Sequence, residues 1–209
     1  MKKSDFRHLF PKKRSDVGHL PTKNAKKAIL VLFVLFLIVY IQYKPYANTP
    51  HSPTNIVETI FVIYQFIITQ TLGIVHEGGH GLCYLVPCPQ FFMVLNGTLF
   101  QWLFPLGIGY YYKKKGNLMA FYIGLFILGL SMDHTAWYMS TAHEGPILPA
   151  HKSFLGVDAI HDFHYIFSSL GVLAYGSFIA GITRAVGILL MVGAVVAMFF
   201  EAFSDKSVK

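Results

Sequence analysis

The chain contains a series of long apolar runs, and these restrict its fold more than any other feature of the sequence. A helix that crosses a bilayer needs about 20 mostly apolar residues, because each residue adds about 1.5 Å against a hydrocarbon core of about 30 Å. Of the 209 residues 54% are hydrophobic and only 13% are charged, a composition too apolar for a soluble protein of one or two domains. We therefore expect an all-α integral membrane protein, a helix bundle of about five to six membrane segments, one of which could be re-entrant.

Five apolar runs are separated by short polar or charged stretches. They are Ile29–Tyr43, Ile56–Leu85, Phe91–Tyr112, Leu118–Met132 and Tyr165–Phe200. The third run contains Asn96, Gly97, Gln101 and Pro105. Because non-helical backbone is tolerated at membrane depth only against protein or a wet cavity, we expect this run to be broken or partly re-entrant.

The last two runs are interrupted in different ways. We expect the fourth to stop at Asp133-His134, after which residues 135–164 are polar and rich in His and Asp. The last run has 36 residues, which would form about 54 Å of helix and exceed one crossing. It is expected to divide at one of three glycines, Gly171, Gly176 or Gly181. Arg184 should then lie at a turn or face the interior of the bundle.

Positive charge is concentrated near the start of the chain. Residues 1–27 contain nine Lys or Arg and two Asp or Glu, whereas the other residues are neutral overall. Such a basic segment beside an apolar run predicts a cytoplasmic N-terminus, as in a multi-pass protein of a bacterial inner membrane. If the first three runs each crossed once, Lys113-Lys114-Lys115 would lie outside, against this rule. We therefore expect one of the runs between His76 and Tyr112 to cross only halfway.

The second run ends in His76-Glu77-Gly78-Gly79-His80, which has the pattern H-E-x-x-H. Residues four apart stack on one face of a helix, so His76 and His80 can offer two imidazoles to one metal ion. Zinc suits these ligands, because its catalytic sites take three protein ligands and leave one position for water. Glu77 can act as the general base toward that water. The pattern therefore predicts a hydrolytic zinc site.

The motif also has a plainer interpretation, because a pattern this short arises by chance in soluble proteins. Its position inside an apolar run changes the balance, since an ionisable side chain at membrane depth costs about 2.5–3.5 kcal/mol and is normally retained for a use. The glycines Gly78, Gly79 and Gly81 are explained equally well by close helix packing and by the approach of a substrate.

On these residues the chain resembles the site-2 protease family of intramembrane zinc metalloproteases, in particular its small members without PDZ domains. Residues 96–105 (Asn-Gly-Thr-Leu-Phe-Gln-Trp-Leu-Phe-Pro) are similar to the segment that follows the zinc helix in that family. The resemblance implies that His76 and His80 bind Zn²⁺ and that Glu77 is the catalytic base. It also implies an endopeptidase that hydrolyses peptide bonds of membrane-embedded substrates, with zinc-bound water as the nucleophile.

The resemblance divides the chain into three parts. Residues 1–27 would be a basic cytoplasmic tail, residues 28–203 a transmembrane metalloprotease-like domain, and residues 204–209 a short polar C-terminal tail. The expected partners are the lipid bilayer and a membrane-protein or peptide substrate. Motifs for nucleic-acid binding are absent from the sequence, and the oligomeric state is left open.

The third ligand in that family is an aspartate of a later membrane segment, and its Asp-Gly motif is not found here. The candidates for this role are Asp133, His134, His143, His151, Asp158, His161, Asp162 and His164. We favour Asp162, because it lies where an apolar segment begins and can project to membrane depth beside the zinc helix. His161 and Asp133 come next. Asp158 and Asp162 share a face of the expected helix, and either could instead cap it or orient a ligating His.

Two other functions remain open. Ten His are compatible with a His-rich di-iron or haem membrane oxidoreductase, although the sequence shows only two close His pairs, His76/His80 and His161/His164. The chain could also be a non-catalytic membrane protein that binds metal.

Two further pairs of residues have weaker claims on function. Cys83 and Cys88 match no familiar zinc pattern, so we expect inert, buried thiols. Asn96 and Gln101 could bind a substrate backbone, but hydrogen bonds between helices are the more general expectation for such residues.

Overall fold

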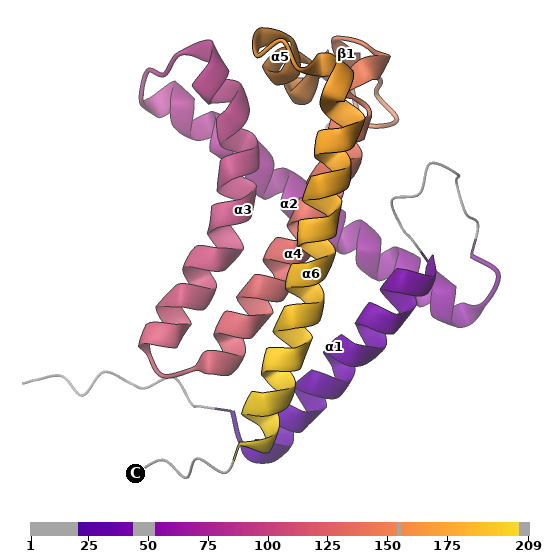
Figure 1. The fold of residues 1–209 in the computed structure, drawn as a ribbon, viewed down its shortest axis with the longest axis vertical. Coiled ribbons are helices and arrows are strands. Elements are labelled where there is room, and N and C mark those ends of the chain that lie inside the picture. Colours follow the sequence, from indigo (N-terminus) through magenta and orange to yellow (C-terminus); the bar gives the residue numbers. More distant parts are fainter. Residues whose placement is uncertain (1–20, 44–52, 154–155, 205–209) are drawn as a thin grey trace, which may run out of the picture.

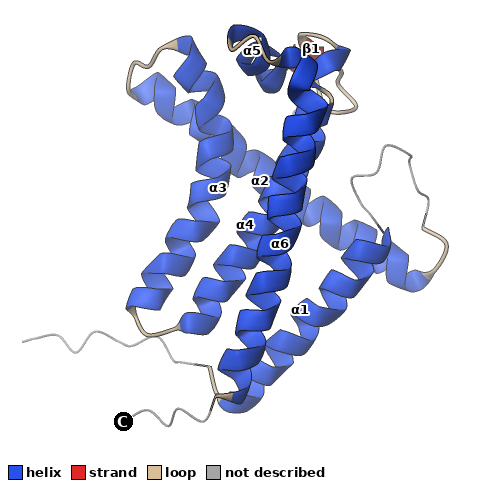
Figure 2. Ribbon diagram, in the orientation of Figure 1, coloured by secondary structure: helices blue, strands red, loops and turns tan. Residues whose placement is uncertain are grey.

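The computed structural model describes residues 21–43, 53–153 and 156–204, which form a bundle of helices (Figure 1). The helices are α1 (Lys23–Tyr43), α2 (Ile56–Leu85), α3 (Gln90–Lys114), α4 (Leu118–Ser140), α5 (Asp162–Ser169) and α6 (Gly176–Phe203), with the short 3-10 helices η2 (Ala142–Glu144) and η3 (Leu173–Tyr175). The antiparallel strands β1 (Ile147–Leu148) and β2 (Ala159–Ile160) lie between α4 and α5 (Figure 2). Most of the predicted basic tail and of the predicted C-terminal tail lies outside the described residues.

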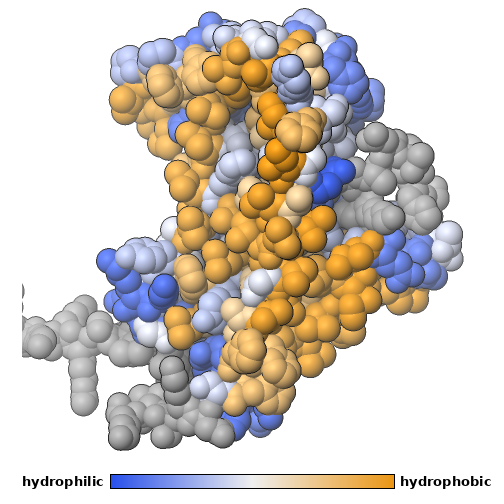
Figure 3. All heavy atoms as spheres, viewed as in Figure 1, coloured by the Kyte–Doolittle hydropathy of each residue, from blue (hydrophilic) through white to orange (hydrophobic). Residues whose placement is uncertain are grey.

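Five stretches of the described chain are long and apolar enough to cross a membrane. They are Lys23–Tyr43, Ile56–Leu85, Gln90–Lys114, Leu118–Glu144 and Leu173–Phe203. Large apolar side chains cover their outer surface, and Leu32, Ile60 and Leu189 are 65%, 61% and 70% exposed. Figure 3 shows an extended apolar face, in orange, over α1 and α6. Such a surface suits lipid rather than water, and it confirms the predicted all-α, multi-pass membrane fold.

Helix α4 lies at the centre of the bundle and packs against both α3 and α6. Its Gly129 faces Gly187 of α6, and a Cβ atom added to Gly129 or to Gly187 would lie 2.5 or 2.7 Å from the carbonyl oxygen of the other. Only glycine permits this approach, which is how small residues bring helices together in membranes. Phe126 and Met191 are fully buried and form the core of the bundle with side chains of α1.

Helix α3 is continuous, so the predicted break or re-entrant turn in the third apolar run is wrong. Pro105 lies inside this helix and has no N–H group to bond the carbonyl oxygen of Gln101, four residues earlier. The hydroxyl of Ser131 on α4 donates a hydrogen bond to that oxygen at 3.4 Å. A neighbouring helix therefore satisfies the freed acceptor, and this makes a proline tolerable at membrane depth.

Helix α4 continues to Ser140, so the predicted end of the fourth run at Asp133-His134 is also wrong. Asp133 is buried, and its carboxylate oxygens accept hydrogen bonds from Arg184 of α6, at 2.8 Å, and from the hydroxyl of Tyr40 of α1. Because this pairing satisfies the acidic side chain inside the bundle, the helix need not end before it. Arg184 therefore points to a partner in the bundle, one of the two positions predicted for it.

The last apolar run is divided into α5 and α6, as its length predicted, and Gly171 after α5 has a φ of 69°. Helix α5 begins at Asp162, while Asp158 precedes β2, so the prediction that these two residues share a helical face is wrong. The N-cap is His161, whose Nδ1 accepts a hydrogen bond from the backbone N–H of His164 at 3.4 Å. Burial lowers the pKa of His161 to about 4, so its imidazole is neutral and can accept this bond.

The two ends of the bundle carry different elements (Figure 1). Helices α1 and α4 start, and α3 and α6 finish, at what we call the lower end, whereas β1 and α5 lie at the upper end. Helix α2 begins beside the end of α1, where Tyr43 contacts Phe61, and it rises to the upper end. Helices α1 and α2 thus lead upward together and α3 returns to the lower end. The lysine triplet therefore lies at the end of the bundle where α1 begins, while the expected half-crossing between His76 and Tyr112 stays a prediction.

Candidate metal centre

The last turns of α2 bring His76 and His80 together near the upper end of the bundle. Residues four apart lie on one face of a helix, and here the two imidazole rings meet edge to face with their centroids 4.7 Å apart. Their Nε2 atoms are 3.1 Å apart. The two nitrogens that could bind one ion therefore point to the same position.

Asp162, at the first position of α5, completes the cluster. Its Oδ2 lies 2.8 Å from Nε2 of His76 and 3.3 Å from Nε2 of His80. Its backbone N–H donates a hydrogen bond to the hydroxyl of Tyr138 on α4 at 3.0 Å, which fixes the start of α5 against the bundle. Among the described residues these three side chains form the one group with donor atoms close enough to hold a metal ion. The favoured third ligand thus lies beside the zinc helix as expected, while its role in binding metal stays a prediction.

Both imidazoles are held by their other ring nitrogen. Nδ1 of His76 lies 3.2 Å from Oε1 of Gln101, and Nδ1 of His80 lies 2.8 Å from the backbone carbonyl oxygen of Met93. Both partners are acceptors, so each Nδ1 carries a proton, and each imidazole in its neutral form would present the lone pair of Nε2 to a metal ion. Metal-binding histidines in proteins are typically oriented in this way.

The donor set fits a zinc ion. Each converging atom is a hydrogen-bond acceptor, and the side chains of His76, His80 and Asp162 are only 11%, 18% and 11% exposed. Zinc ligands at about 2.0–2.1 Å in a tetrahedron lie about 3.3–3.4 Å from one another, close to the separations found here. Two neutral imidazoles and an ionised carboxylate are the forms in which these side chains bind a metal.

A cavity of about 620 Å³ lies beside the three donors. Glu77 lines it and is half-buried, but its carboxylate is not part of the donor cluster. The other polar groups along the wall include Gln101, Tyr138 and Lys152. The acid next to the first imidazole is thus placed to act on a molecule in the cavity rather than to bind the ion.

The Asn96-Gly97 segment of α3 packs directly against the two imidazoles. A Cβ atom added to Gly97 would lie 2.6 Å from Nε2 of His80 and 2.8 Å from Nε2 of His76. Asn96 donates a hydrogen bond from Nδ2 to the carbonyl oxygen of Gly79 at 2.6 Å, which ties α3 to the motif. A side chain at position 97 would displace the imidazoles, so glycine is required for this helix contact. The general expectation that Asn96 and Gln101 bond between helices is confirmed.

The remaining seven candidates for the third ligand lie outside the donor cluster. They are Asp133, His134, His143, His151, Asp158, His161 and His164. His134 and His151 line the same cavity, and Nδ1 of His134 lies 3.4 Å from the Gln101 amide nitrogen. His164 bonds a backbone carbonyl of η2 at 2.8 Å, and Asp158 accepts a backbone N–H at 2.9 Å in the loop between the strands. None of these seven described side chains brings a donor atom to the cluster of His76, His80 and Asp162.

Sequence reasoning missed two groups that position the centre. Tyr138 stacks on His161, with ring centroids 4.5 Å apart, while its hydroxyl holds the backbone of Asp162. The chain has twelve Tyr, and nothing in the sequence distinguishes this one. The carbonyl of Met93 is a backbone group and has no sequence signal at all.

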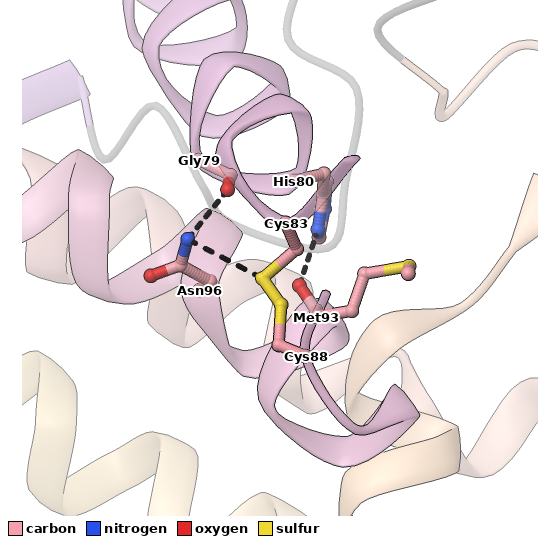
Figure 4. Close-up of a disulfide and its surroundings, with 6 residues drawn as sticks. All are labelled: Gly79, His80, Cys83, Cys88, Met93 and Asn96. Atoms are coloured by element: carbon pink, nitrogen blue, oxygen red, sulfur yellow. Dashed lines mark hydrogen bonds between the residues drawn. A yellow bond between two sulfur atoms is a disulfide. The ribbon is translucent and has the colours of Figure 1, made fainter. Parts of the chain in front are cut away.

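The expectation of free, inert thiols is wrong, because Cys83 and Cys88 form a disulfide. Their Cα atoms are 5.5 Å apart, and the bond joins the last turn of α2 to the turn before α3. Figure 4 shows it beside the hydrogen bonds from Asn96 to Gly79 and from His80 to Met93. The disulfide therefore closes the hairpin that carries both imidazoles.

Comparison of the chain with protein-family models, with curated proteins and with solved structures found no match. The case for a function therefore rests on the geometry of the chain itself.

Proposed function

We propose that the chain is a zinc-dependent intramembrane endopeptidase of the site-2 protease type. The observation that carries this proposal is the convergence of three acceptor atoms, from His76, His80 and Asp162, beside a cavity that Glu77 also lines. The imidazoles and the carboxylate come from α2 and α5 and are up to 86 residues apart in the chain. A chance H-E-x-x-H pattern has no reason to meet a buried third donor.

The residues have distinct roles in this proposal. His76, His80 and Asp162 would hold Zn²⁺, which when bound polarises a carbonyl group and makes water a competent nucleophile at neutral pH. Glu77 accepts the proton of the attacking water and returns it to the amine that leaves. Gln101 and the Met93 carbonyl keep the two Nε2 atoms unprotonated and directed at the ion.

The cavity suits a peptide. Its wall combines apolar side chains such as Val94 and Leu148 with many polar ones such as Gln70, and sites for small molecules and peptides likewise place polar groups among apolar ones. The hydroxyl of Tyr138 accepts the Asp162 N–H, and its own proton can be donated to a substrate carbonyl in the cavity.

A single cluster also favours zinc over the di-iron alternative. Di-iron carboxylate sites in helical bundles use several Glu and His ligands from four helices. The described residues offer three donors in one group. These support one ion, with a position left for water.

We propose in addition that the N-terminus is cytoplasmic, in a bacterial inner membrane. The concentration of nine basic residues in 1–27 supports this orientation, and so does the position of Lys23, Lys26 and Lys27 at the same end of the bundle as the lysine triplet after α3.

The test is a comparison of Glu77→Gln with His80→Ala in the purified full-length protein. Zinc content is measured by mass spectrometry, and cleavage is measured on synthetic single-span peptides by detection of new termini. Glu77→Gln should keep one zinc and lose cleavage by on the order of 100-fold or more, the size of a general base contribution. His80→Ala should lose both.

Two matched controls keep this test specific. Glu58→Gln makes the same chemical change in the first turn of α2, and His143→Ala removes an exposed imidazole outside the cluster. Both should keep zinc and cleavage. Full cleavage by Glu77→Gln would refute the proposed mechanism. If function in the cell were lost in His80→Ala but retained in Glu77→Gln, the chain would be a non-catalytic metal-binding protein.

A further inference from the structure

The disulfide lies at the same end of the bundle as the metal centre. Cys83 is one turn after His80 on α2, and Cys88 lies two residues before the start of α3 at Gln90. Met93, whose carbonyl orients His80, is on the first turn of α3 (Figure 4). The oxidised cysteines and the imidazoles therefore lie at the same end of the bundle.

The lysines of the described residues gather at the lower end, with one exception. They are Lys23, Lys26 and Lys27 at the start of α1 and Lys113, Lys114 and Lys115 at the end of α3. Lys26 forms an ion pair with Glu201, and Lys27 lies 5.1 Å from the ring of Phe203, which places the start of α1 beside the end of α6. The exception is Lys152 in the loop after β1, and it forms an ion pair with Glu144.

Helix α3 connects the disulfide to the lysine triplet, so its length gives the distance between them. It has 25 residues, from Gln90 near the disulfide to Lys114 in the triplet, and at about 1.5 Å per residue it is about 37 Å long. The hydrocarbon core of a bilayer is about 30 Å thick. The disulfide and the lysine triplet therefore lie far enough apart to be on opposite sides of a membrane.

We infer that the metal centre opens to the non-cytoplasmic side and, on the proposed function, that its substrate is a juxtamembrane peptide segment on that side. Lysine-rich ends of membrane helices stay in the cytoplasm, whereas disulfides persist in oxidising compartments outside it. The lysine distribution is an electrostatic signal, and the disulfide is a signal of redox chemistry. The two are independent, and they give the same orientation.

The wall of the cavity supports this class of substrate. Part of it comes from outside the spanning helices, including Leu148 of β1, Ile160 of β2 and the loop residues His151, Lys152 and Ser153. These residues belong to the segment between α4 and α5 at the upper end (Figure 1). A peptide bond just beyond the non-cytoplasmic end of a transmembrane segment can reach the donors from this side.

Orientation is tested by thiol labelling of the full chain in intact cells with a membrane-impermeant maleimide. Single cysteines are introduced as His143→Cys near the upper end and Lys115→Cys at the lower end, both exposed positions, with Cys83 and Cys88 changed to Ser. His143→Cys should react in intact cells, and Lys115→Cys only after the cells are permeabilised. The reverse pattern would overturn the inference.

The disulfide is tested in the chain with its native cysteines. Alkylation with a maleimide of high mass during cell lysis should leave the protein unshifted on a gel, and prior reduction should add two labels. Two labels without reduction would mean that Cys83 and Cys88 are thiols, and the redox argument would fail.

The substrate class is tested with two single-span reporter proteins that carry the same peptide segment on opposite sides of the span. Only the reporter with the non-cytoplasmic segment should be cleaved, and Glu77→Gln should cleave neither. Cleavage of the cytoplasmic segment instead would overturn the inference. If the labelling is as expected and neither reporter is cleaved, the endopeptidase and its substrate class are refuted, whereas the orientation of the centre stands.

Discussion

Two carboxylates of the described residues are buried in the bundle, and their surroundings differ in kind. Asp133, in the middle of α4, accepts hydrogen bonds from the guanidinium of Arg184 and the hydroxyl of Tyr40. Asp162, at the start of α5, faces the Nε2 atoms of two imidazoles whose protons are held elsewhere. One carboxylate has its cation within the chain, and the other sits among acceptors that need one.

This difference separates a structural charge from a binding charge. A buried acid with a fixed cation is fully satisfied, and its contribution is to hold helices together. Converging acceptors with no donor between them are costly unless an ion or bound protons join them. Burial of an ionisable group in a membrane is therefore a weak sign of function by itself, and its partners decide which role it has.

The largest effect should come from the carboxylate that lacks a cation. Asp162→Ala removes one of three donors, so zinc affinity should fall by on the order of 100-fold or more, beyond the effect of losing an outer-shell partner. Asp158→Ala, in the loop before β2, is the matched control and should leave affinity unchanged. The measurement is zinc titration of the metal-free protein against a competing chelator. If zinc affinity fell equally in Asp133→Asn and in Asp162→Ala, the distinction between a structural and a metal-binding carboxylate would be wrong.

The paired carboxylate should affect stability instead. Asp133→Leu removes the buried carboxylate that accepts the hydrogen bond from Arg184 Nε, and we expect the free energy of unfolding in detergent to fall by about 2–3 kcal/mol. The value is below that of a fully enclosed pair because the Arg184 side chain is 40% exposed. Adding Arg184→Met should restore most of the loss while zinc binding stays intact. A double variant no more stable than Asp133→Leu would show that the pair is not the cause.

The smallest effect should come from the amide that orients His76. Gln101→Leu removes the acceptor for Nδ1–H, and zinc affinity should fall by about 10-fold. Gln101→Glu keeps an acceptor at that position and should retain most of the affinity. The same chelator titration measures both variants. If the leucine variant binds zinc as tightly as the parent, the proposed orientation of His76 is not needed for the centre.

Local pattern was enough to predict most of the helices and the three residues that meet in the candidate site. The apolar run Ile56–Leu85 has the same bounds as α2, because composition and length decide a spanning helix. The i and i+4 spacing likewise fixes His76 and His80 on one face. Asp162 was favoured for a local reason too, since it stands where an apolar segment begins.

The errors arose where a distant residue supplies what the local sequence lacks. Pro105 signals a break, but Ser131 satisfies the carbonyl that it frees. Asp133 signals a helix end, but Arg184 lies 51 residues further on. Their partners depend on how α3, α4 and α6 pack, which no single segment specifies.

The central claim is that His76, His80 and Asp162 hold one zinc ion, and X-ray absorption at the zinc edge of the purified full-length protein tests it most directly. We predict one zinc per chain, with light-atom ligands at about 2.0–2.1 Å and the outer-shell scattering of two imidazoles. The His80→Ala variant should lose the metal. A protein without stoichiometric zinc, or zinc bound without imidazole scattering, would contradict the account.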